Sequence, residues 1–91
     1  MVTKSVLIKL YAPTSQSLKD KRSIVKGIIA SLRRKFNLSV AEVEDQDMLQ
    51  TISIGMAVVT TSYVHAQGVL DEAIRFLDEN ESAEIFKINF D

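Results

Sequence analysis

A dense group of basic side chains between residues 19 and 35 is the strongest chemical feature of this sequence. Seven of the eleven Lys and Arg residues fall there, beside a single acid. In a helix, about 100° per residue places four of them along one flank over roughly 20 Å. Such a row is suited to contact the phosphates of a nucleic-acid backbone. The candidate nucleic-acid-binding residues are Lys19, Lys21, Arg22, Lys26, Arg33 and Arg34.

A second interpretation of these cations is internal neutralisation. The second predicted helix carries Asp71, Glu72, Asp78 and Glu79, with only Arg75 among them. Two helices on one face of a sheet lie side by side, so the basic helix could balance the acidic one, although surface ion pairs add little stability. Seven cations exceed what that pairing needs, which favours an external anionic partner.

Four carboxylates lie close together in the middle of the chain, at Glu42, Glu44, Asp45 and Asp47. Carboxylate oxygens are the ligands that hard cations prefer. Their spacing does not match the calcium loop of an EF-hand, and no glycine stands at the turn. The pattern favours a solvated hairpin loop, and no metal site is predicted.

No residue pattern for covalent or acid–base catalysis stands out. The chain has no cysteine, and His65 is its only histidine. Without a second histidine or a cysteine to join it, His65 is expected at the surface. A glycine-rich phosphate loop and a nucleophile motif are also missing. We therefore expect a protein without enzymatic activity and without a cofactor.

Length and composition set the scale of the molecule. A chain of 91 residues supports one domain, which is expected to cover residues 1–91. Hydrophobic residues at 46% and charged residues at 25% are typical of globular proteins. No apolar run approaches the ~18 residues that a membrane span needs, and the N-terminal segment does not resemble a signal peptide. With no cysteine, these features predict a cytoplasmic protein without membrane contact.

Hydrophobic periodicity predicts the six elements that must position the basic row. Alternating apolar positions indicate strands, and apolar positions three or four residues apart indicate helices. The predicted elements are a strand over 2–11, a helix over 18–36, strands over 38–44 and 51–61, a helix over 63–79 and a strand over 83–90. Ser17 and Asp20 match a capping box, Ser62 is the expected second N-cap, and Asn37 is the expected left-handed C-cap of the first helix.

The order strand, helix, strand, strand, helix, strand predicts an α+β fold of the ferredoxin-like type. Two interleaved βαβ units give a four-stranded antiparallel sheet with both helices on one face. Phe86, Ile88 and Phe90 are expected on the inward side of the last strand. Gly55 is expected at a bulge or at a close packing contact.

The sheet face away from the helices is a second candidate surface. Only Tyr11 is aromatic on its central strands, so base stacking of the kind used by RNA-recognition motifs is not predicted. The apolar residues expected to meet there are Leu7, Tyr11, Val59 and Ile85. A flat apolar patch on a small domain suits a protein partner or a second copy. We therefore predict self-association through this face.

Three stretches together resemble the YlxP-like family, domain of unknown function 503. They are "SLKDKRSIVK" (17–26), "FNLSVAEVEDQD" (36–47) and "ISIGMAVVT" (52–60), and the resemblance covers essentially the whole chain. The family consists of small bacterial proteins with a ferredoxin-like fold, whose genes tend to lie beside those for translation initiation and ribosome-maturation factors. The resemblance implies a role near RNA or the ribosome, and it brings no catalytic residues.

Two functions are consistent with these features. The first is a small non-enzymatic accessory protein, associated with RNA or the ribosome, that docks the anionic RNA backbone on the basic helix. The alternative is a homodimeric protein-interaction or regulatory module without a nucleic-acid role.

Overall fold

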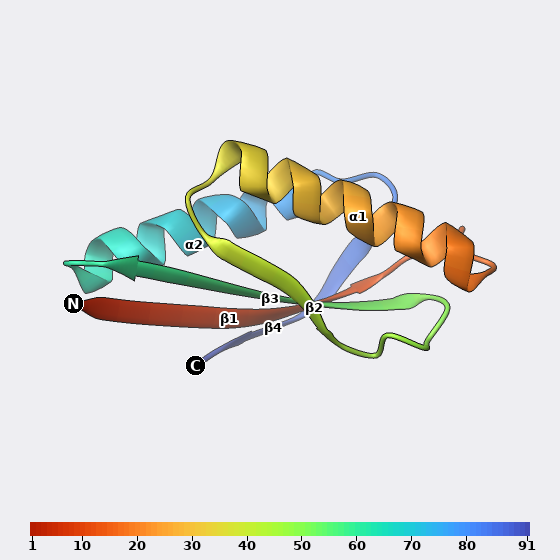
Figure 1. Cartoon of the computed structure of the whole chain (residues 1–91), viewed down its shortest axis with the longest axis horizontal. Coiled ribbons are helices and arrows are strands. Elements are labelled where there is room, and N and C mark those ends of the chain that lie inside the picture. The colour runs from red at the N-terminus through yellow and green to blue at the C-terminus, as the bar shows by residue number, and fades with distance from the viewer.

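Six elements follow one another in the order predicted from the sequence. The computed structural model describes all 91 residues (Figure 1). The elements are β1 (Val2–Tyr11), α1 (Leu18–Lys35), β2 (Ser39–Glu44), β3 (Thr51–Thr60), α2 (Tyr63–Asp78) and β4 (Glu84–Phe90). Their bounds differ from the predicted ones by a single residue at most, because the apolar periodicity of each segment is strong.

The four strands form one antiparallel sheet in the order β2-β3-β1-β4. The central strand β1 pairs with β3 along its whole length, and Ile8 lies opposite Ile54 on one side and Ile88 on the other. Val6, Ile8 and Leu10 are at most 2% exposed, since alternate residues of β1 point into the core. The arrangement is the predicted ferredoxin-like plait.

Both helices begin at a serine that accepts a hydrogen bond from a backbone amide. Ser17 accepts from the amide of Asp20 at 3.0 Å, and Ser62 accepts from the amide of His65 at 3.3 Å. The Asp20 carboxylate reaches back to the amide of Gln16 at 3.1 Å, one residue before the capping-box position. Neither helix has the length and apolarity that crossing a membrane would require.

The C-terminal end of α1 differs from the prediction. The capping residue is Phe36 in an extended conformation, with φ at −128°. Asp45 is the sole non-glycine residue with a positive φ, so the predicted left-handed cap at Asn37 is wrong. The chain runs from the helix almost directly into β2, which an extended Phe36 permits. The Phe36 ring packs edge-on against Phe76 of α2, with the ring centroids 5.8 Å apart.

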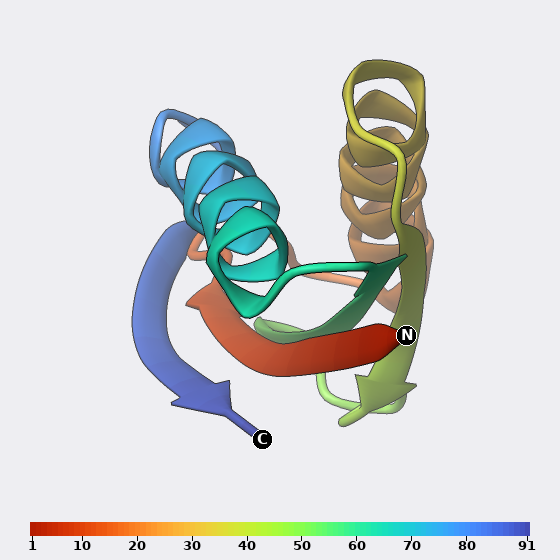
Figure 2. The ribbon, with the colours of Figure 1, turned by 90° about the vertical axis from the view of Figure 1, so that its left-hand side faces the viewer.

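The helices cover different parts of the same sheet face. Figure 2 shows α2 across the middle of the sheet and α1 standing over the edge strand β2. The core between helices and sheet consists of seventeen buried apolar residues. From the helices it takes Val25, Ile28, Leu32, Ala66, Leu70, Ala73 and Leu77. This placement leaves the outer surface of α1 open to solvent along the edge of the molecule.

Gly55 lies at a close packing contact, as its position in a strand predicted. Val43 is the extra residue of a bulge in β2, where the register with β3 shifts between Glu42 and Glu44. A β-carbon added to Gly55 would lie 2.9 Å from Cγ1 of Val43. The missing side chain therefore makes room for the bulged valine.

Strand β4 is less covered than its apolar pattern predicts. Ile88 and Phe90 lie opposite Ile8 and Val6, and so on the helix side of the sheet, yet they are 46% and 37% exposed. Phe86 is the extra residue of a bulge against β1 and is 58% exposed. The prediction that these side chains pack into the core is therefore wrong. They stay exposed because α2 lies mainly over β1 and β3.

Candidate nucleic-acid interface

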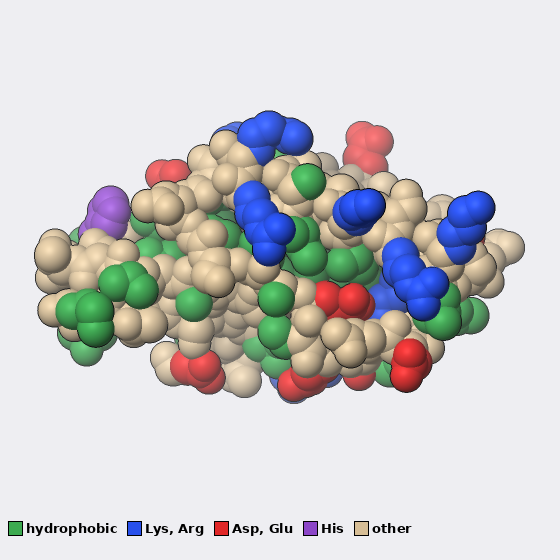
Figure 3. Space-filling model, in the orientation of Figure 1, with side chains coloured by type: hydrophobic (Ala, Val, Ile, Leu, Met, Phe, Trp, Pro, Cys, Tyr) green, Lys and Arg blue, Asp and Glu red, His purple; other side chains and the backbone are tan.

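The outer surface of α1 carries a row of exposed cations. Lys19, Arg22, Lys26 and Arg33 are exposed on one flank, and Arg34 is exposed beside them. From Lys19 to Arg33 the helix rises about 21 Å at 1.5 Å per residue. Figure 3 shows the basic side chains spaced along α1, with acidic groups below them over β2 and its loop. The sequence prediction of a cationic row on the outer layer is confirmed for these five residues.

None of these five cations is neutralised by a carboxylate of the same chain. The ion pairs of the molecule all involve Lys9 or Lys21. Arg33 donates to the carbonyl of Val40 at 3.4 Å, and Arg34 donates to the hydroxyl of Ser31 at 3.5 Å. The acidic helix α2 therefore does not balance the row through ion pairs.

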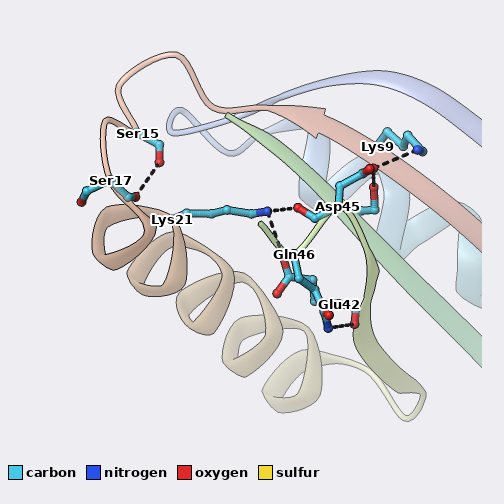
Figure 4. Close-up of polar contacts among 8 residues, drawn as sticks. Lys9, Ser15, Ser17, Lys21, Glu42, Asp45 and Gln46 are labelled. Carbon is cyan, nitrogen blue, oxygen red and sulfur yellow. Dashed lines mark hydrogen bonds and ion pairs between the residues drawn. The ribbon is translucent and has the colours of Figure 1, made fainter. Parts of the chain in front are cut away.

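Lys21 is not part of the exposed row. Its side chain is 2% exposed and points beneath α1 toward the sheet (Figure 4). There Nζ donates to the backbone carbonyl of Asp45 and lies 3.2 Å from Oε2 of Glu42. Its assignment to the nucleic-acid interface is corrected on this ground, since a buried ammonium cannot meet a phosphate without leaving both partners.

The helical periodicity of α1 indicates that Lys21 is buried. Lys21 precedes the buried residues Val25, Ile28 and Leu32 by four, seven and eleven residues, which is the spacing of one helix face. Its positive charge suggested an exposed position, whereas its spacing from these buried residues places it on the inward face of the helix. A long aliphatic stem with a polar tip is well suited to such a site.

The acidic loop after β2 is organised around lysines. Asp45 Oδ2 accepts from the hydroxyl of Ser53 at 2.6 Å and from Nζ of Lys9 at 2.9 Å. Lys9 also lies 3.1 Å from Glu44. Asp45 adopts a φ of 57°, a conformation that Asp tolerates better than most residues. Glu44 and Asp45 thus pair with Lys9 and tie the start of the loop to β1 and β3. Residues 46–50 of the loop are exposed, as predicted for a solvated hairpin loop.

These contacts shift the protonation of two groups. The hydrogen bond from Ser53, aided by that from Lys9, lowers the pKa of the Asp45 carboxyl below its ordinary value of 3.8. The hydrogen bonds to Asp45 and Glu44 raise the pKa of Lys9 above 10.5. Both groups are therefore charged at neutral pH, which keeps these ion pairs intact.

The open sheet face does not form the predicted apolar patch. Ile85 lies opposite Leu10 and packs against the core, so it faces the helices. Tyr11 is at one end of β1, whereas Val59 lies opposite Thr3 near the other end. Eight residues of strand separate these positions by about 27 Å. Only Leu7 occupies the middle of the face, so the four residues do not make one contact surface.

The middle of the open face is hollow where a flat patch was expected. A cavity of about 520 Å³ opens on this face, and the residues that line it include Leu7, Ala41, Gly55 and Ala57. Tyr11 and Val59 lie outside it. His65, the sole histidine, is exposed at the start of α2, as expected.

The fold and the basic helix define a small α+β protein of the ferredoxin-like class with one cationic outer helix. The chain belongs to the family described as "Protein of unknown function (DUF503)", whose model matches residues 4–90. It is similar to the uncharacterized protein YlxP of Bacillus subtilis (strain 168), with 39% identity over 62 residues. That match covers 68% of this chain and 67% of the relative. The resemblance to the YlxP-like family is thereby confirmed.

Proposed function

We propose that this chain is a non-enzymatic accessory protein that binds structured RNA, in particular ribosomal RNA, through the exposed face of α1. The observation that carries the proposal is the row of five exposed cations, none of which has a carboxylate partner in the chain. The net charge of the whole chain is −1, so this local concentration of charge is not a consequence of overall composition.

The geometry of the row suits a phosphate backbone. Arg22 and Arg33 offer planar guanidinium groups that can contact phosphate oxygens through two hydrogen bonds, which an ammonium group cannot do. The row lies on a rigid helix, so its cations are held at fixed spacing. Binding would be directed at the backbone and would depend little on base sequence.

The salt dependence of binding tests this proposal. A structured ribosomal RNA fragment is titrated with the protein at several salt concentrations. If four phosphates are contacted, the logarithm of the binding constant should fall with the logarithm of salt concentration with a slope of roughly −3 to −4. A slope near zero would exclude the proposed mode.

A charge reversal in α1 gives the complementary test. Replacing Arg22, Lys26 and Arg33 by Glu should abolish binding while thermal stability stays nearly unchanged, because all three are exposed. Arg75→Glu provides a matched control for Arg22→Glu, since Arg75 is an exposed helical arginine on the acidic helix α2. Equal losses for these two single variants would show that net charge, and not the row, governs binding.

A further inference from the structure

Strand β4 forms an outer edge of the sheet and leaves large apolar side chains in solvent. Phe86, Ile88 and Phe90 are 58%, 46% and 37% exposed, and they follow one another at alternate positions of the same strand. Figure 2 shows β4 at the margin of the molecule, with no element beyond it. Exposed apolar edges of this kind template pairing with another strand.

The backbone amides and carbonyls of β4 that do not bond to β1 belong to Ile88 and Phe90. The amide of Asp91 donates to the carbonyl of Ser5 at 3.1 Å, which identifies these two as a hydrogen-bonded pair. Such pairs alternate along antiparallel strands. Ile88 and Phe90 therefore belong to the other kind of pair, and their amides and carbonyls point away from β1. The unpaired backbone groups and the exposed side chains thus follow the same line of the strand, and Phe90 has Nζ of Lys4 over its ring, 5.4 Å from the centroid.

The two edge strands differ in where their bulges and charges lie. Strand β2 carries Glu42 and Glu44 and is bulged at Val43. Charges and bulges on an edge strand discourage further pairing. The bulge of β4 lies at Phe86, near its start, and the remainder from Lys87 onward keeps a regular register with β1. This regular part is available to another strand.

We propose that two copies of the chain associate by antiparallel pairing of β4 with β4, with Ile88 opposite Ile88 of the second copy. The outward-pointing backbone groups of one strand must oppose those of the other, which limits the registers. Centring on Ile88 also brings Phe90 of each copy toward the bulged Phe86 of the other, so the exposed apolar side chains gather at the contact.

The charges of β4 agree with this register. Centring on Ile88 places Lys87 opposite Asn89, an uncharged residue. Centring on Lys87 would place two ammonium groups opposite each other and would set Phe90 against Glu84, which is unfavourable on both counts. The strand is therefore complementary to a second copy of itself, which a two-fold symmetric contact requires.

Such pairing would join two sheets into one of eight strands. Because α1 stands over β2, at the far edge from β4, both basic helices would lie at the outer ends of the assembly. The proposal does not depend on RNA binding, and a failure of either proposal would leave the other standing.

Sedimentation of charge variants tests the pairing. The unmodified protein should sediment as a dimer at high micromolar concentration, whereas Ile88→Lys and Ile88→Glu should each be folded monomers. Mixing the two variants should restore a dimer, because the lysine of one variant then lies opposite the glutamate of the other where the two β4 strands pair. Val64→Lys, at an 84% exposed position of α2, is the control and should remain dimeric. A monomeric parent protein, or no recovery on mixing, would overturn the proposal.

Cross-linking tests the register without adding charge. The chain has no cysteine, so Ile88→Cys introduces a single thiol. Directly opposed residues in a hydrogen-bonded pair have Cα atoms about 5.5 Å apart, within the range that a disulfide spans. Mild oxidation should give a disulfide-linked dimer of Ile88→Cys and little of Val64→Cys. Equal yields from both variants would contradict the proposed contact.

Discussion

Nζ of Lys21 lies 3.2 Å from Oε2 of Glu42 beneath the first turns of α1. The carboxylate oxygen is buried and accepts no hydrogen bond, so Lys21 is its only neutralising contact. The same ammonium group donates to the carbonyl of Asp45. One lysine thus joins the helix that carries the basic row to β2 and to the loop that follows.

Removing Lys21 should destabilise the fold strongly. Lys21→Met keeps most of the aliphatic stem but leaves Glu42 without a counter-charge, which should cost about 2–4 kcal/mol of unfolding free energy. Urea denaturation of Lys21→Met, Glu42→Gln and the double variant measures the coupling. The double variant should be more stable than Lys21→Met alone, and additive losses would show that the pair does not interact.

The exposed and buried lysines of α1 should differ in their effect on RNA binding. Lys26→Gln removes an exposed cation and should make the salt slope shallower by about 0.7 to 0.9. Lys21→Met should leave the slope unchanged in conditions where it is folded, because its ammonium is buried. Fluorescence anisotropy at several salt concentrations gives both slopes, and a shallower slope for Lys21→Met would place that lysine at the interface.

Asp45 should contribute to stability in a pH-dependent way. Its folded pKa is lowered, so the unfolded state binds more protons in acid and the contribution disappears as the pH falls below about 4. Asp45→Asn suits the comparison because Asn also tolerates a positive φ. The difference in unfolding free energy between the two proteins should be constant near neutral pH and shrink toward zero in acid. A difference independent of pH would show that the carboxylate charge contributes nothing.

The ion pairs of Lys9 should make stability depend on pH in the alkaline range. Its raised pKa means that its contribution is complete below 10.5 and is lost as the pH rises through the folded value.

The effect of Gly55→Ala on stability should depend on the side chain at position 43, because Val43 lies against Gly55. Gly55→Ala crowds Cγ1 of Val43 and should cost about 1 kcal/mol. In the background of Val43→Ala the same change should be neutral or stabilising by up to about 1 kcal/mol, since Ala suits a strand better than Gly. Thermal unfolding of the four proteins in this cycle measures the difference.

The elements and the fold were predictable because each segment carries its own pattern. Alternation in β1 and β3 and the three-to-four spacing in α2 leave little doubt about type and length. The exposed row on α1 was predictable for the same reason, since Arg22, Lys26 and Arg33 all fall outside the apolar stripe.

The features that sequence reasoning missed depend on long-range contacts. A bulge shifts the register of β4, so Ile85 faces the core, although simple alternation places it on the open face. The partners of Lys21 come from β2 and from a loop 24 residues away, which periodicity within α1 does not reveal. The exposure of Ile88 depends on where α2 lies, and no pattern within β4 encodes that.

The helix α1 is fastened near both of its ends, by Lys21 to the loop at Asp45 and by Phe36 to the ring of Phe76. Its amide hydrogens should therefore exchange with solvent water in a concerted way, because fraying at either terminus first requires one of these contacts to break. Loss of one fastening would let that end exchange early while the other stays protected. Exchange measured residue by residue would thus report the state of each contact separately, without any ligand present.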